Sequence, residues 1–402
     1  MKTFLRLAPV VVGYAVLGFF WLAVWQQFFG AMGPRLGHVG AGGMRVNDWP
    51  CGGPQCDFSA FWPAGVLARA GQAGVVYDPG AFLAARHKML WAGAEPVRWF
   101  YPPPALLPVM AVSLLPFEAG FWVWTAVLTG LAVWLLRWAG LGWGVIAVGM
   151  LSPAALWNAE LGQFGTVTGA LVVASAMVLE ARPGLAGALL GVLAIKPQAG
   201  ILVGVAMLGR RRFWRGILVG VGVVLGLAAA VTMWAGWGVW KDYFGEGLAV
   251  SKAVVLAVPP AGSYYEQFGV SVFWALRVLG AGVGAAYEVQ ALVAACGAAA
   301  VWWVWRRGWG DLTSRMALTV LLSLLATPYG YTDDMVGYSV ALAACAARRG
   351  WRIDVLDAML FLWPAFCPIV FMRTGVLLTP VVVAVAGLRV FWRGRGGVVT
   401  GG

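Results

Sequence analysis

Charge is what this sequence has least of. Only 11% of its 402 residues are Asp, Glu, Lys or Arg, and it has two histidines and five cysteines. Hydrophobic residues make up 61%, whereas soluble globular domains average about 45–50%. The chain also lacks the alternating segments of about ten residues that are typical of membrane β-barrels. These shortages exclude a soluble domain and predict an all-α integral membrane protein.

The basic residues lie at the ends of apolar segments, although the formal net charge of +12 would suggest nucleic acid as a partner of a soluble protein. Such clusters mark cytoplasmic loops next to anionic lipid. We therefore expect membrane lipids and no nucleic acid as partners. The clusters contain Arg210, Arg211, Arg212, Arg215, Arg306, Arg307, Arg348, Arg349, Arg352, Arg393 and Arg395.

The apolar segments predict one polytopic domain over residues 1–402, with about 10–13 transmembrane helices and no internal repeat. The predicted spans include 104–117, 216–237, 285–305 and 353–372. Lys2 and Arg6 precede an apolar run at 8–29, which we interpret as a signal anchor with its N-terminus inside. Positive-inside counting then places three outer loops at 31–100, 241–268 and 327–334. The topology of 142–208 stays open, because 184–208 reads as one kinked span or as two half-spans.

The first outer loop, 31–100, carries the carboxylate Asp57 between a Gly/Pro-rich turn and an apolar run. An ionised carboxylate beside hydrocarbon is costly unless water, a cation or a substrate compensates it. Cys51 and Cys56 flank this turn, and an oxidising compartment would join them in a disulfide; two unpaired thiols are the alternative. Segments 58–70 and 79–91 read as two short interfacial helices, the second with Arg86 on its flank.

Lys196, before Pro197 in an apolar segment, is the most expensive of the polar residues to insert, at about 2.5–3.5 kcal/mol. It needs an anionic partner, for which a lipid-linked phosphate and Glu160 are the candidates. The alternative is a lysine that extends to the membrane interface.

Other polar residues predicted to face the outside are Glu266 and Gln267 in the second outer loop and the pair Asp333-Asp334 in the late loop. Adjacent acids on a helix point in different directions, so we expect one to face a cavity and the other to cap the next helix, for about 1 kcal/mol. The residue spacing gives no EF-hand or short zinc motif, and we predict no metal. Tyr101, before three prolines, reads either as part of a stiff entry turn or as a substrate-facing residue.

Several short motifs follow one another over residues 11–342: Asp57-Phe58, Val76-Tyr77-Asp78, Phe100-Tyr101-Pro102-Pro103, Gly162-Gln163, Lys196-Pro197-Gln198 and Thr327-Pro328-Tyr329. In this order the sequence resembles glycosyltransferase family 87, a GT-C type family that includes polyprenyl-phosphomannose-dependent mannosyltransferases. Such mannosyltransferases often have a histidine in the late outer loop, where this sequence has none.

The resemblance implies a GT-C-like bundle in the inner (plasma) membrane that needs no cofactor. It would transfer a mannose-like hexose from a polyprenyl-phosphate donor to a lipid-linked or envelope glycan acceptor on the periplasmic face. Asp57 would be the general base of an inverting reaction. The alternative function is a transporter or flippase, which broken helices suit but the long ordered outer loop does not. The expected substrate-binding residues are Tyr101, Gln163, Lys196, Gln198, Gln267, Tyr329, Asp333 and Asp334.

Overall fold

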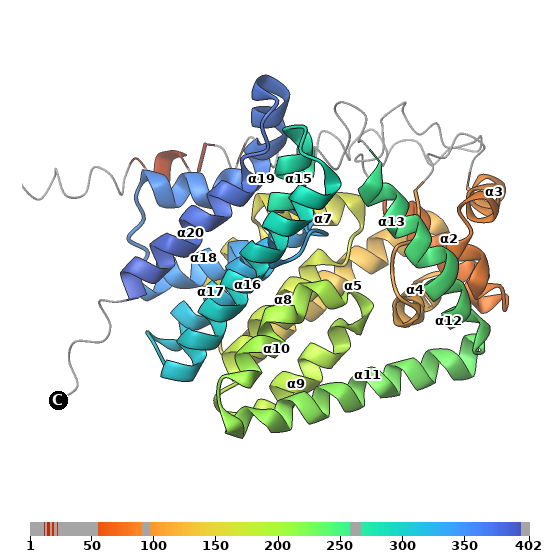
Figure 1. The fold of residues 1–402 in the computed structure, drawn as a ribbon, viewed down its shortest axis with the longest axis horizontal. Coiled ribbons are helices and arrows are strands. Elements are labelled where there is room, and N and C mark those ends of the chain that lie inside the picture. Colours follow the sequence, from red (N-terminus) through yellow and green to blue (C-terminus); the bar gives the residue numbers. More distant parts are fainter. Residues whose placement is uncertain are drawn as a thin grey trace, which may run out of the picture.

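The computed structural model describes residues 55–90, 97–257 and 267–394, together with a few residues between 12 and 22 (Figure 1). Within these ranges the chain consists of α-helices joined by short 3₁₀ and π turns, and its only strand-like pairing is the single bridge between Gly269 and Tyr331. The predicted all-α fold is confirmed. The predicted first span lies largely outside the described residues, as do Cys51, Glu266 and the C-terminal tail.

Within the described ranges, four helices are long and apolar enough to cross a membrane: α5 (Phe117–Trp138), Arg211–Ala235 with α11 (Trp214–Ala235), α16 (Val283–Arg307) and α19 (Val355–Thr374). A fifth crossing would be the pair α6 (Trp143–Met150) and α7 (Pro153–Leu161), which bends by 55°. These helices make the chain a multi-pass integral membrane protein. Length and composition support four or five crossings among the described residues, against the 10–13 expected for the whole chain.

Several other helices are apolar but shorter than a span. The predicted span at 104–117, for example, becomes α4 (Leu106–Val112), because the helix ends before Pro116 and α5 begins after it. The remaining α-helices are α8 (Gly165–Val178), α9 (Pro183–Val192), α10 (Ile201–Leu208), α12 (Gly238–Asp242), α13 (Leu248–Leu256), α15 (Val272–Val278), α17 (Leu312–Ala326), α18 (Val336–Arg348) and α20 (Thr379–Gly394).

The two short helices of the first outer loop form where they are predicted, as α2 (Phe58–Arg69) and α3 (Pro79–Met89). Asp78 caps α3, since its side chain accepts hydrogen bonds from two backbone N–H groups of the first turn at 2.9 Å. α2, however, is buried within the protein. A Cβ on Gly65 would lie 2.1 Å from the carbonyl oxygen of Val109, so the backbones of α2 and α4 are in direct contact.

The segment at 184–208 is two half-helices and not one kinked span. α9 and the 3₁₀ turn η3 (Leu193–Ile195) end at Lys196, and the chain restarts through η4 (Pro197–Gly200) into α10. Pro197 supplies no backbone N–H, and Lys196 has a non-helical φ of −147°. The first half-helix therefore ends at Lys196. A break of this kind needs surrounding protein to satisfy its polar groups.

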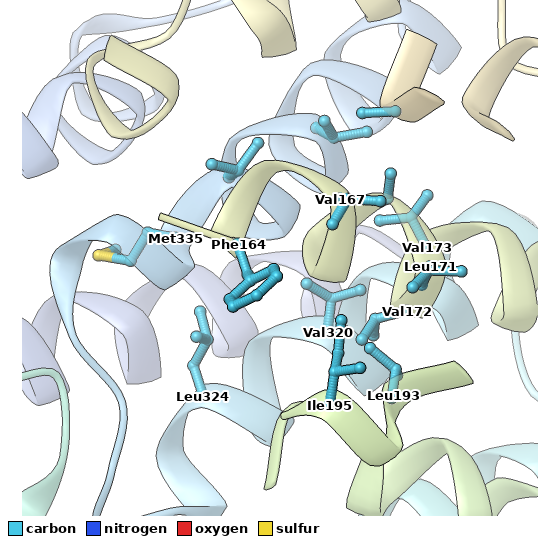
Figure 2. Packing of buried hydrophobic residues seen from close by; sticks show 14 of the residues in the cluster. Phe164, Val167, Leu171, Val172, Val173, Leu193, Ile195, Val320, Leu324 and Met335 are labelled. Atoms are coloured by element: carbon cyan, nitrogen blue, oxygen red, sulfur yellow. The ribbon is translucent and has the colours of Figure 1, made fainter. Parts of the chain in front are cut away.

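α8 is the centre of the core, and its residues from Gly165 to Ala176 are all buried. Figure 2 shows Val167, Leu171, Val172 and Val173 of this helix among their neighbours. An apolar helix without a polar face is stable only when other elements surround it. Around it lie side chains of the Lys196 break, of α17 and of the 3₁₀ turn η7 (Thr332–Met335). α8 therefore fixes the positions of segments that are far apart in the sequence. The labelled residues from these neighbours are Leu193, Ile195, Val320, Leu324 and Met335.

Candidate active site

Asp57 precedes the first turn of α2 but does not cap it: its φ and ψ are already helical and its side chain makes no capping hydrogen bond. The carboxylate is thereby left to face the interior of the site. Gln55, with a φ of +62°, holds the turn in place. Its backbone N–H donates to the carbonyl oxygen of Glu160 at 2.7 Å, and its side-chain amide donates to Glu118 at 2.9 Å. Asp57 is thus anchored to both α5 and α7.

The structure describes only one of the two cysteines in the disulfide that the sequence predicts at this turn. Cys56 is disulfide-bonded, whereas Cys296, Cys345 and Cys367 are free thiols. Cys51, the partner expected from the sequence, lies outside the described residues, so the pairing itself stays a prediction.

The Asp57 carboxyl group lies near three other charged side chains that the sequence separates by more than a hundred residues. Burial raises its pKa to about 7, and the negative charge of Asp333 adds to this effect, whereas Gln163 and Lys196 lower the pKa. Asp57 nevertheless keeps part of its surface accessible. We call Asp57, Asp333, Asp334 and Lys196 the carboxylate cluster. Burial is the main cause of the high pKa of Asp57, and the two neighbouring carboxylates raise it further against the opposing effect of the ammonium group.

Gln163 connects the carboxylate cluster to Tyr101. The Tyr101 hydroxyl donates to Gln163 Oε1 at 2.8 Å, and the backbone N–H of Phe164 donates to the same oxygen at 3.0 Å. With its oxygen occupied, Gln163 has its amide N–H groups left for Asp57. The preceding Gly162 ends α7 in the left-handed conformation, with φ of +74°, which turns Gln163 into the site. Tyr101 is therefore a site residue as well as part of the entry turn.

Lys196 is buried, with 4% of its surface exposed, and its ammonium group pairs with acidic side chains. It hydrogen-bonds Asp334 and lies 3.9 Å from Asp333 Oδ2. The late loop thus supplies the acidic partners of Lys196, and neither of them was among the two candidates from the sequence. A lipid-linked phosphate at Lys196 stays a prediction, and the burial of Lys196 argues against a lysine that extends to the interface. Glu160 instead meets the Asp57 turn through its backbone.

Asp333 and Asp334 do not divide their roles as expected, since both carboxylates approach Lys196. Asp334 combines the two roles, because its Oδ2 also accepts the backbone N–H of Tyr331 at 3.3 Å and so caps η7. The expectation assumed the start of an α-helix. The segment is a 3₁₀ turn, and the Lys196 ammonium group lies within ion-pair distance of both carboxylates.

A small cavity of about 30 Å³ lies behind the Lys196–Asp334 pair. Gln198 and Tyr329 line it together with that pair, so two further predicted substrate-binding residues join the site. Gln267 immediately precedes a segment that is joined to the late loop: Phe268 accepts a hydrogen bond from Thr332 Oγ1 at 3.0 Å, and Val270 donates to Gly330 at 3.0 Å. Gln267 therefore lies beside the late loop, while Glu266 is outside the described residues.

Two supporting residues were missed by the sequence analysis. Arg86 was expected on the flank of a surface helix but is fully buried, and it donates to Ser59 O at 3.0 Å and to Ser59 Oγ at 2.8 Å, which fixes the start of α2. Asn158 donates to Asp333 O at 3.3 Å and accepts from Thr166 Oγ1 at 2.6 Å, which joins the late loop to α8. Asn158, a polar residue in a mainly apolar run, could have been found from the sequence, whereas Arg86 begins the basic run Arg86-His87-Lys88 and gives no such signal.

The cluster offers a proton acceptor with a pKa near neutrality beside a buried ammonium group, a pairing suited to taking a proton from a hydroxyl while an anion departs. In the part of the chain that the structure describes, no group of three or more His, Cys, Asp and Glu side chains could hold a metal ion.

Comparison with curated proteins and with solved structures gives no match. The model of glycosyltransferase family 87, by contrast, matches residues 99–328, which is more than half of the chain. The matched region contains Tyr101, Gln163, Lys196 and Gln198, and it ends just before the Asp333-Asp334 turn. The chain therefore belongs to glycosyltransferase family 87 and is a multi-pass membrane glycosyltransferase.

Proposed function

We propose that this glycosyltransferase is of the GT-C type and transfers a mannose-like hexose from a polyprenyl-phosphate donor to a lipid-linked or envelope glycan acceptor, with Asp57 as general base. The observation that carries the proposal is the position of Asp57. It is a partly accessible carboxylate with a pKa near 7, in a cluster whose ammonium group is buried.

Asp57 would accept the proton of the acceptor hydroxyl as that oxygen attacks the anomeric carbon of the sugar. The bond from the anomeric carbon to the phosphate oxygen breaks, and its electron pair leaves with the polyprenyl phosphate. A single displacement inverts the anomeric centre and needs only one catalytic carboxylate. Gln163, whose oxygen is fixed by Tyr101 and Phe164, keeps the Asp57 carboxylate in one orientation for this step.

Lys196 is the cation we assign to the departing phosphate, since developing negative charge is stabilised by a cation fixed in advance. Asp333 and Asp334 hold the ammonium group charged in a buried place. The Lys196 side chain also lines the small cavity, together with Gln198 and Tyr329. These two residues supply polar groups for the donor's phosphate or sugar.

The outer face of the inner membrane is the proposed location of this site. α18 starts directly after η7, which carries Asp333 and Asp334, and it ends at Arg348. Thirteen helical residues span about 20 Å, so an arginine-rich end lies well away from the carboxylate cluster. Because arginine-rich ends favour the cytoplasmic side, we assign the cluster to the periplasmic side, where polyprenyl-linked donors and envelope acceptors would meet it.

The test uses the purified full-length protein in liposomes with radiolabelled polyprenyl-phosphate mannose and a membrane lipid extract as acceptor. We expect a new glycosidic product and released polyprenyl phosphate in equal amounts. Movement of the labelled lipid across the bilayer without a glycosidic product would show a transporter instead. Transfer from a nucleotide sugar, with no polyprenyl carrier present, would contradict the proposed donor class.

A further inference from the structure

A second and much larger cavity, of about 460 Å³, lies at the other end of α18. Its walls come from α6, α17, α18, α19 and α20, and Tyr14 also lines it, with its hydroxyl donating to the carbonyl oxygen of Trp351 at 2.6 Å. We call it the arginine cavity. Its volume falls within the range of about 300–1,000 Å³ in which proteins bind small molecules.

Arginines dominate the charged side of the arginine cavity. Arg349, Arg389 and Arg393 surround Asp357, which accepts from them at 2.8–3.0 Å, and Asp354 pairs with the last two. Arg348, which also lines the cavity, pairs with Asp311 at 3.0 Å through one nitrogen atom. The group as a whole holds four guanidinium groups and three carboxylates, so positive charge is in excess.

Arg348 is the member best placed to meet a ligand. A guanidinium group has five N–H donors, and within the described residues Asp311 is the single partner of Arg348. Its side chain is 58% exposed. The other three arginines are held in a network with Asp354 and Asp357, and they supply a fixed positive field around it.

Apart from these charged residues, the lining of the arginine cavity is mainly apolar. The cavity therefore has a cationic mouth and a hydrocarbon wall, and a free phosphate ion would contact the mouth alone. A molecule with an anionic head and an apolar chain would contact both. The apolar lining residues include Val148, Leu342, Ala343, Ala346, Leu360 and Phe361.

We propose that the arginine cavity binds one anionic phospholipid, with its phosphate group at Arg348 and the neighbouring arginines and one acyl chain along the apolar wall. Anionic lipids concentrate on the membrane face at which basic residues gather. The site is separate from the carboxylate cluster, and it would remain if the proposed sugar donor were wrong.

The test is binding to the delipidated full-length protein in a neutral detergent, measured by native mass spectrometry with phosphatidylglycerol, phosphatidylcholine or inorganic phosphate. We expect one phosphatidylglycerol to bind, with at least tenfold preference over phosphatidylcholine. Inorganic phosphate at millimolar concentration should not displace it. Equal binding of the two lipids would overturn the proposal, and displacement by inorganic phosphate would indicate an anion site without a lipid.

Three variants locate the bound lipid. Arg348→Gln removes the exposed guanidinium group, and Ala346→Phe fills the apolar wall while it leaves every charge in place; each should weaken phosphatidylglycerol binding at least fivefold. Arg212→Gln is the matched control, because Arg212 is 54% exposed and is ion-paired with Glu180 at 3.6 Å outside the cavity. It should change binding less than twofold. Equal losses in Arg348→Gln and Arg212→Gln would show general surface attraction and contradict the site.

Discussion

The two ends of α18 use the same kinds of side chain for opposite purposes. At its start, three carboxylates share one lysine; at its end, four arginines share three carboxylates. The sign of the charge in excess at each end of α18 influences what that end can do. At the start of α18, burial first and the neighbouring carboxylates second raise the pKa of Asp57 to about 7, and a base results. Where arginines are in excess, the carboxylates hold them in place and the surface attracts anions.

The largest expected effect comes from removing the proposed base. Asp57→Asn keeps the shape of the side chain but cannot accept a proton, so transfer should fall about 10²–10⁴-fold. Folding should not suffer, because burial already disfavours the charged form of Asp57. Asp78→Asn is the matched control, since Asp78 also precedes a helix of the first outer loop but only caps it. Product formation by both purified variants is the measurement, and near-normal transfer by Asp57→Asn would remove Asp57 from the mechanism.

A second prediction contrasts the cationic side chains at the two ends of α18, Lys196 and Arg348. Lys196→Met leaves Asp333 and Asp334 buried without an ammonium group, which should cost about 3–5 kcal/mol of stability. Arg348→Met breaks an exposed pair and should cost at most about 1 kcal/mol. Chemical unfolding in neutral detergent measures both. The double variant Lys196→Met with Asp334→Asn should recover part of the loss, and equal stability of the two single variants would contradict the buried pair.

A third prediction concerns the contact that positions the late loop. A Cβ on Gly165 would lie 2.1 Å from Asp333 O and 2.5 Å from Asn158 Nδ2, so Gly165→Ala should displace η7 and lower kcat/KM about tenfold. Gly130, on α5, has nothing within 4 Å of the same position. Gly130→Ala should leave kcat/KM unchanged and add up to about 1 kcal/mol of stability through helix propensity. If both variants keep full activity, the position of η7 does not control catalysis.

Helix positions were predictable where the pattern is local. α11, α16 and α19 lie within a few residues of the predicted spans, because long apolar runs bounded by arginines allow few alternatives. α4 is shorter than expected since Pro116 separates it from α5. The number of crossings was harder to predict, because apolar runs such as α8 are buried inside the protein and resemble lipid-facing spans in sequence.

The members of the site were predictable, but their partners were not. Polar residues in apolar surroundings pointed to Asp57, Gln163, Lys196 and the late loop, since each is costly there. The pairing of Lys196 with Asp334 joins residues 138 positions apart, and it depends on how α8 packs between them. No local pattern encodes that contact, which is why the sequence left Glu160 as a candidate.

The pH dependence of kcat/KM tests the central claim, that Asp57 is the base and that its neighbours set its strength. The raised pKa means that activity should fall as the pH drops through about 7. Asp333→Asn removes a repelling charge and should move this limb to lower pH, whereas Gln163→Leu removes a stabilising contact and should move it to higher pH. Opposite shifts in the two variants would support the claim; an acidic limb that stays in place in both would contradict it.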